Sequence, residues 1–150
     1  MTTTVALHTT DSIESEIERL HRAICERAYA ICRDDSVAHE GELSDWLTAE
    51  RELVWRPAAE LRRKGGRYEV LVATAGVPLE DLDVEVSPDD VVIKGNVHHR
   101  HTAAKGEVEL CEFHSGELFR LVHFPERVDT TAVKTAYTNG LLQIIAPIAQ

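Results

Sequence analysis

The C-terminal third of the chain holds the pattern that most restricts its fold, a turn between two apolar segments. Residues 132–137 and 141–147 are mostly apolar or β-branched, and Asn139 and Gly140 lie between them. An Asn-Gly pair in this position predicts a β-hairpin, because both residues tolerate the positive φ of its tight turn. Residues 118–124 are also rich in aromatic and β-branched side chains, and Pro125 ends that segment. The last third therefore predicts β-strands throughout.

Alternation of apolar and polar residues predicts further strands upstream. It occurs in residues 68–72, 82–86 and 107–113, and a fourth, apolar segment, 91–97, is closed by a glycine, Gly95. Short strands with frequent turns are typical of a β-sandwich. We expect a mainly β, antiparallel β-sandwich domain over residues 55–150.

Residues 11–54 have helical periodicity instead. Apolar residues recur every three or four positions from Ile13 to Ile31, which predicts an amphipathic helix over about 12–33. A second stripe runs from Leu43 to Val54 and stops before Pro57. Neither helix is long enough to be stable alone, so we expect them to form a helical hairpin module over residues 11–54. The threonine-rich residues 1–10 are expected to be disordered.

The charge balance excludes several classes of partner. The 150 residues include 26 acidic and 16 basic side chains, a net charge of −10, which argues against binding to nucleic acid or to an anionic membrane surface. The three cysteines form no disulfide framework, since Cys25 and Cys32 would lie about 10 Å apart on a helix. With no leader and no membrane-length apolar segment in this sequence, we expect a cytoplasmic protein.

Few residues suggest catalysis or metal binding. His98, His99 and His101 could ligate a metal ion, although a solvated loop is the favoured interpretation. Cys111 and His114 are close in sequence but project to opposite faces of a strand, which argues against a nucleophile and base pair. No phosphate-binding glycine loop is present. We expect no enzyme activity, no metal and no cofactor.

Four stretches together resemble the small heat-shock proteins, whose α-crystallin domain is an immunoglobulin-like antiparallel β-sandwich. Residues 139–147 are similar to the family's signature hairpin and 116–125 to the strand before it, while 55–61 resemble its opening strand. Residues 68–77 resemble the strand before its Pro-Gly-Val turn, with Ala75 where proline is usual. The helical module resembles a short bacterial domain of uncharacterised function. Within it, Trp46 and Tyr29 either pin the two helices together or form a partner surface.

The resemblance implies an ATP-independent molecular chaperone, a holdase, which binds partly unfolded client proteins and suppresses their aggregation. It implies a client-binding groove between two strands, with Val84 and Val86 on one and Val133 and Thr135 on the other. It also implies a homodimer in which a strand from the loop after residue 97 pairs with the partner's opening strand. The implied interface residues are Trp55, Pro57, Leu61, Leu110, Phe113 and Arg120. For Arg120, an arginine facing solvent at the rim is an equal alternative.

Two departures from the family pattern affect assembly. This sequence ends three residues after Pro147, so it lacks the usual isoleucine-x-isoleucine anchor, and the helical module stands in place of the flexible N-terminal arm. We therefore expect a dimer or small oligomer whose groove is less occluded than usual. The alternative functions are a p23-like co-chaperone or adaptor that docks on a folded partner, and a metal-responsive binding protein that uses the histidine loop.

Overall fold

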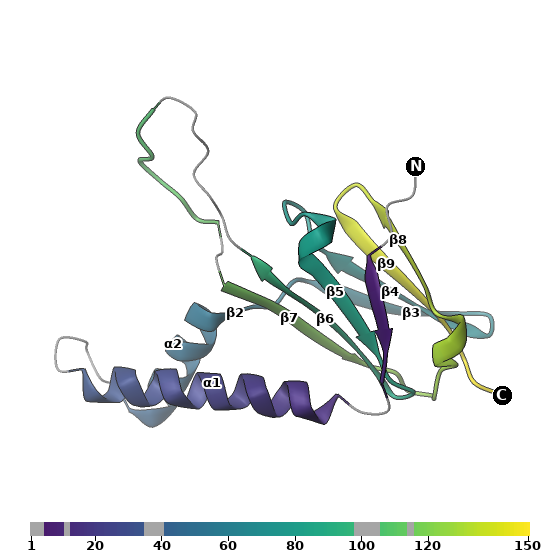
Figure 1. Cartoon of the computed structure of the whole chain (residues 1–150), viewed down its shortest axis with the longest axis horizontal. Helices are drawn as coiled ribbons and strands as arrows, with labels where there is room; N and C mark the ends of the chain where they lie inside the picture. Colours follow the sequence, from purple (N-terminus) through teal and green to yellow (C-terminus); the bar gives the residue numbers. More distant parts are fainter. Residues whose placement is uncertain (1–4, 11–12, 35–40, 98–105, 114–115) are drawn as a thin grey trace.

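The fold is mainly β, a two-sheet sandwich preceded by two helices, as the sequence predicts (Figure 1). The computed structural model describes residues 5–10, 13–34, 41–97, 106–113 and 116–150. Its helices and strands are β1 (Ala6–Thr9), α1 (Glu14–Arg33), α2 (Glu42–Leu53), β2 (Val54–Trp55), β3 (Ala59–Lys64), β4 (Arg67–Ala73), β5 (Leu82–Val86), β6 (Asp90–Val97), β7 (Gly116–His123), β8 (Lys134–Thr138) and β9 (Leu141–Pro147). Short 3₁₀ turns, Leu79–Asp81 and Thr130–Ala132, precede β5 and β8.

One sheet has the strand order β1-β5-β6-β7-β2, and the other has β3-β4-β9-β8. The second sheet is antiparallel throughout. In the first, β5, β6 and β7 are antiparallel, but the short edge strands β1 and β2 run parallel to β5 and β7. The sandwich is therefore antiparallel at its centre and mixed at two edges, where a purely antiparallel arrangement was expected.

The predicted hairpin is confirmed. Asn139 and Gly140 have φ values of 52° and 80°, the two positive angles that the turn requires. The turn joins β8 to β9, with Thr138 paired to Leu141. β9 also pairs with β4 along its whole length, from Leu141 to Pro147. The hairpin thus supplies half of the strands of the second sheet.

The main core lies between the two sheets. Successive residues of a strand point to opposite faces, so every second residue of β4, β5 and β9 is buried there. The fully buried side chains of these strands are Val70, Val72, Leu82, Val84, Val86, Leu142, Ile144 and Ala146.

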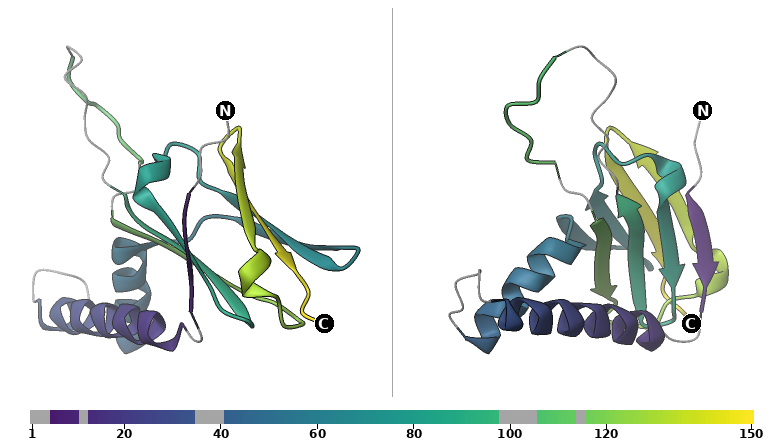
Figure 2. Two further views of the ribbon diagram at one scale, coloured as in Figure 1. Left: turned by 45° about the vertical axis from the view of Figure 1, so that its right-hand side comes forward. Right: turned by 60° about the vertical axis from the view of Figure 1, so that its left-hand side comes forward.

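β6 and β7 are apolar on both faces, because the helices cover their outer side. α1 runs crosswise to these strands (Figure 2). Leu20 and Ile24 of α1 share a buried cluster with Val92 of β6 and Phe119 of β7. α2 packs beside α1, with Ala49 fully buried in the same cluster and with Arg27 Nε 2.6 Å from Glu52 Oε2. The helical hairpin is therefore present, and it is docked on the sandwich.

Two expectations are wrong for the residues that the structure describes. Residues 6–9 form β1 instead of being disordered, because Val5 and Leu7 project to one side and the edge of β5 offers hydrogen-bonding partners. Residues 107–113 form no strand within the chain. They extend away from the sandwich, where no neighbouring strand is available to pair with them (Figure 1).

Candidate functional site

The site that the family resemblance implies lies along β5, and β1 covers its edge. Ala6, Leu7, His8 and Thr9 pair in parallel with Asp83, Val84, Glu85 and Val86, in that order. The ladder continues for one more bond, from the Thr10 amide to the Val86 carbonyl at 2.9 Å. Val5 is 4% exposed and belongs to the core between the sheets, and Leu7 packs against that core.

Three of the four predicted groove residues lie together. Val84 and Val86 are fully buried on β5, and Val133, 8% exposed, belongs to the same cluster. Thr135 is half-buried on β8, opposite Ile144. The expectation of a less occluded groove is wrong, because the chain's own N-terminal strand lies along the β5 side. The alternation of Val5 and Leu7 with Ala6 and His8 was the sequence signal for this strand.

The outward side of the same edge carries charge. His8 Nε2 lies 3.0 Å from Asp83 Oδ1, which links β1 to β5 outside the core. One pair further along, Glu85 Oε2 lies 3.2 Å from Lys94 Nζ on β6. The β5 edge therefore combines an apolar inner side with an acidic outer side.

The predicted interface residues at the start of the sandwich are dispersed over three segments. Trp55 belongs to β2 and pairs with Leu118 of β7, whereas Leu61 belongs to β3 and pairs with Val70. Pro57 lies in the segment that connects β2 to β3, and its side chain is buried. β3 is the last strand of its sheet, and along the part of the chain that the structure describes, no strand pairs with its outer edge.

The other predicted interface residues differ in their exposure. Leu110 and Phe113 are 78% and 71% exposed on the extended segment, far from the sandwich core. Arg120 is half-buried on β7, opposite Ile93, and its Nε atom is buried without a hydrogen-bond partner among the described residues. Arg120 thus is not a fully solvated rim residue. Its role in an interface stays a prediction.

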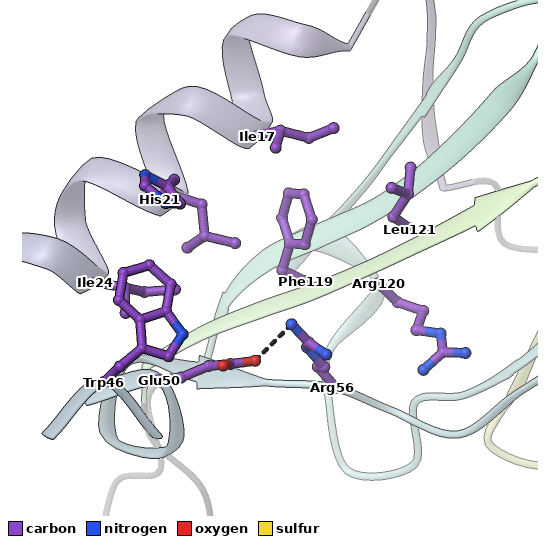
Figure 3. A pocket seen from close by; sticks show the side chains of 10 residues that line it. Ile17, His21, Ile24, Trp46, Glu50, Arg56, Phe119, Arg120 and Leu121 are labelled. Carbon is purple, nitrogen blue, oxygen red and sulfur yellow. Dashed lines mark ion pairs between the residues drawn. The ribbon is translucent and has the colours of Figure 1, made fainter. Parts of the chain in front are cut away.

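A cavity of about 450 Å³ is lined by residues of α1, α2 and β7, and the sequence did not predict it. Figure 3 shows Ile17, Ile24 and Phe119 on its apolar side. Across from them, Arg56 forms an ion pair of 2.5 Å with Glu50. Its lining comes from α1, α2, β7 and the segment after β2, so its location depends on the packing of distant segments, which strand and helix periodicity cannot supply.

The helices are also held to the sheet by ion pairs. Lys94 Nζ on β6 lies 3.1 Å from Glu16 Oε1 on α1, and Arg19 forms an ion pair with Glu117 on β7. Burial alone would raise the pKa of Glu16, but the hydrogen bond and charge of Lys94, together with Arg19, lower it overall. Burial likewise opposes the charged form of Lys94, and Glu16 and Glu85 together raise its pKa.

The described residues offer no candidate metal centre. Among them, no three histidine, cysteine or carboxylate side chains are grouped closely enough to hold a metal ion. His98, His99, His101 and His114 lie outside the described residues. Cys25, Cys32 and Cys111 are free and exposed. No described helix has the length and apolarity that crossing a membrane requires.

Comparisons with known proteins agree with this architecture. The chain is 26% identical over 104 residues to a probable 15 kDa heat shock protein of Leptospira interrogans, covering 69% of this chain and 78% of that protein. Among solved structures, it resembles heat shock protein 16.0 from Schizosaccharomyces pombe with a TM-score of 0.59 and 22% identity, covering 64% of this chain and 89% of that one. HSP18.5 from E. histolytica matches with a TM-score of 0.55 and 23% identity, covering 64% and 90%. The family model described as Hsp20/alpha crystallin matches residues 60–150, and the chain therefore belongs to the Hsp20/alpha crystallin family of small heat-shock proteins.

Proposed function

We propose that the protein is an ATP-independent holdase, which binds partly unfolded proteins and prevents their aggregation. Family membership supports a chaperone role, and the observation that carries the finer proposal is the β5 edge. That edge holds an extended segment through backbone pairing and through the burial of Val5. An unfolded protein exposes extended apolar segments, and adding such a segment to a sheet edge is a general mode of peptide recognition.

The apolar side chains on the surface support the same proposal. Leu110 and Phe113 on the extended segment and Leu43 on α2 are each more than two-thirds exposed. Large exposed apolar side chains, when they gather, mark surfaces that bind other proteins. These positions would add weak and unselective contacts to a client held at a strand edge.

We propose further that the working unit is a homodimer formed by strand exchange. The extended segment around residues 106–113 belongs to neither sheet, and none of the described strands pairs with the outer edge of β3. Pairing the segment of one protomer with β3 of the other would satisfy both in a symmetric arrangement. The three exposed, free cysteines favour a reducing compartment, so a cytoplasmic location is part of the proposal.

Light scattering of a heat-labile model protein at its aggregation temperature tests the holdase activity. The assay compares an equimolar amount of this chain, without nucleotide, with an equal mass of a stable acidic protein as the control. Suppression of scattering by this chain alone is the expected result. Undiminished scattering at several-fold molar excess would contradict the proposal and favour an adaptor that docks on a folded partner.

A further inference from the structure

The cavity lined by α1, α2 and β7 combines an apolar wall with a polar end. Leu20 and Ile24 of α1 and Phe119 of β7 belong to the wall, and none of them is more than 7% exposed. Ile17 and Leu121 also line the cavity but are 40% and 36% exposed, so part of its apolar surface is in contact with water. The volume, about 450 Å³, is in the range of small-molecule sites in proteins. The cavity can therefore hold the apolar body of a small ligand.

The polar end is formed by α2 and by the segment after β2. Arg56 lies 2.5 Å from Glu50 in an ion pair, and Figure 3 shows the indole nitrogen of Trp46 turned to the same side. An indole N–H can only donate a hydrogen bond, and a guanidinium has more N–H groups than one carboxylate can accept. The Arg56 side chain is 63% exposed, so its remaining donors can be reached from solvent. Donors therefore outnumber acceptors at this end of the cavity.

We propose that this cavity binds a small amphiphilic anion, a carboxylate with an unbranched aliphatic body. The carboxylate accepts hydrogen bonds from Arg56 and Trp46, and the aliphatic body lies against Ile17, Ile24 and Phe119. Charge-assisted hydrogen bonds from an arginine are stronger than neutral ones, and the planar guanidinium matches the geometry of a carboxylate. Covering the apolar wall removes its exposed part from water, which favours binding in proportion to the area covered.

A cationic head group fits the polar end less well. Glu50 is the only carboxylate among the described lining residues, and it is already paired with Arg56. His21 closes the cavity beside Trp46, with the two ring centroids 5.0 Å apart, and it adds no negative charge. A cation at this end would meet the like charge of Arg56, whereas an anion is attracted to it.

The site is separate from the β5 edge to which the holdase proposal refers. Phe119 belongs to the cluster that the helices share with β6 and β7, whereas Val84 and Val86 belong to the core between the sheets. A ligand in the cavity contacts both the helices and β7, so its binding should stabilise the docked position of the helical hairpin. The inference thus goes beyond the proposed function, and its test requires no client protein.

Isothermal titration calorimetry of the full-length chain with sodium decanoate, below its micellar concentration, tests the site. We expect saturable binding of one decanoate per chain. Arg56→Gln should bind about tenfold more weakly, because it loses the charge-assisted hydrogen bonds. Glu50→Gln should bind severalfold more tightly, because its side chain no longer competes for Arg56. The matched control is Arg51→Gln, which removes the same charge from an arginine of α2 that does not line the cavity.

Two further ligands and the tryptophan emission define the head group, the body and the location. Hexanoate, a shorter homologue, should bind at least about tenfold more weakly, because each methylene adds buried apolar area. Decyltrimethylammonium, with an equally long body and a positive head group, should also bind more weakly than decanoate. The chain has two tryptophans, Trp46 and Trp55, and only Trp46 lines this cavity. Decanoate should therefore change the emission of Trp55→Phe but leave that of Trp46→Phe unchanged.

Three results would overturn the inference. The first is no saturable binding of decanoate at millimolar concentration. The second is equal affinity of Arg56→Gln and Arg51→Gln, with both variants shown to be folded by circular dichroism. The third is an emission change that persists in Trp46→Phe, which would place the ligand elsewhere. A chain that binds decanoate but suppresses no aggregation contradicts the holdase proposal alone, and one that suppresses aggregation but binds no decanoate contradicts this inference alone.

Discussion

Lys94 on β6 lies 3.1 Å from the carboxylate of Glu16 on α1, which ties the helical module to the sandwich. The same ammonium group lies 3.2 Å from Glu85 on β5. The side chains of Lys94 and Glu16 are 21% and 23% exposed, so solvent screens their interaction less than at a typical surface pair. Two strands and a helix thus share one cation.

Glu16→Gln is expected to lower the free energy of unfolding at neutral pH by about 0.5–1 kcal/mol, the upper part of the range for partly exposed ion pairs. Glu18→Gln, an exposed position on the same helix, is the matched control and should change little. Urea denaturation followed by circular dichroism measures both. Equal stabilities of the two variants would show that the pair with Lys94 contributes nothing.

The ion pair between Glu16 and Lys94 also predicts that the stability of the fold depends on pH. The pKa of Glu16 is lowered in the folded chain, since the favourable contacts with Lys94 and Arg19 exceed the cost of burial. A carboxyl group with a lowered pKa stabilises the fold above its unfolded pKa, and this contribution is lost as the pH falls through the folded value. The stability difference between the natural chain and Glu16→Gln should therefore be fully present above the unfolded pKa of a glutamate, about 4.3, and shrink as the pH falls below it. A difference that grows on acidification would contradict this sign.

Strand exchange predicts that charge on the extended segment disrupts the dimer. Leu110→Asp with Phe113→Asp should convert the dimer to a monomer, because the two carboxylates remove the apolar contacts of the segment and would have to lose their hydration in the interface. Size-exclusion chromatography with multi-angle light scattering measures the mass. Leu43→Asp, an equally exposed leucine on α2, is the control and should remain dimeric. A double variant that keeps its dimeric mass would exclude this segment from the interface.

The geometry of the hairpin turn predicts that alanine destabilises the fold much more at Gly140 than at Gly66. Gly140 has a φ of 80°, and a Cβ there would lie 2.8 Å from the Ala75 side chain. Gly140→Ala should therefore cost about 1–3 kcal/mol of unfolding free energy, from the strained backbone and the close contact together. At Gly66 a Cβ meets nothing within 4 Å, so Gly66→Ala is the control and should cost little. Thermal denaturation compares them.

These examples show which parts of the fold local sequence can specify. Asn139 and Gly140 demand one turn type, and alternation in β4, β5 and β9 assigns one face of each strand to the core. Such signals lie within a few residues of each other, so they can be recognised before any tertiary contact is known.

The features that the sequence did not predict depend on contacts between residues distant in sequence. β1 is only four residues long, and its order comes from the edge of β5, more than 70 positions away. Residues 107–113 alternate as a strand does, but alternation cannot supply a neighbour to pair with. The groove residues Val84, Val86 and Val133 could be named from the family pattern, whereas their covering by Val5 could not.

The packing of the helices on the sheet is indicated by the sequence of β6, and it leads to a further prediction. Val91, Val92 and Ile93 are consecutive apolar residues of β6, and all three are fully buried. A strand covered on both faces reads as a continuous apolar run, while one covered on a single face alternates. Leu118 and Phe119 give β7 the same character, with Phe119 on the helix side.

Phe119→Ala should lower the free energy of unfolding by about 3–5 kcal/mol, because Phe119 is 7% exposed and its removal leaves a cavity against Leu20 and Ile24. Leu121→Ala, on the same face of β7 but 36% exposed, is the matched control and should cost about 1 kcal/mol or less. Urea denaturation followed by circular dichroism compares the two variants. If Phe119→Ala cost no more than Leu121→Ala, α1 would not be packed on β7 in solution, and the helices would be an independent module. The expected large difference would instead mean that the helices and the sandwich share one core and unfold together.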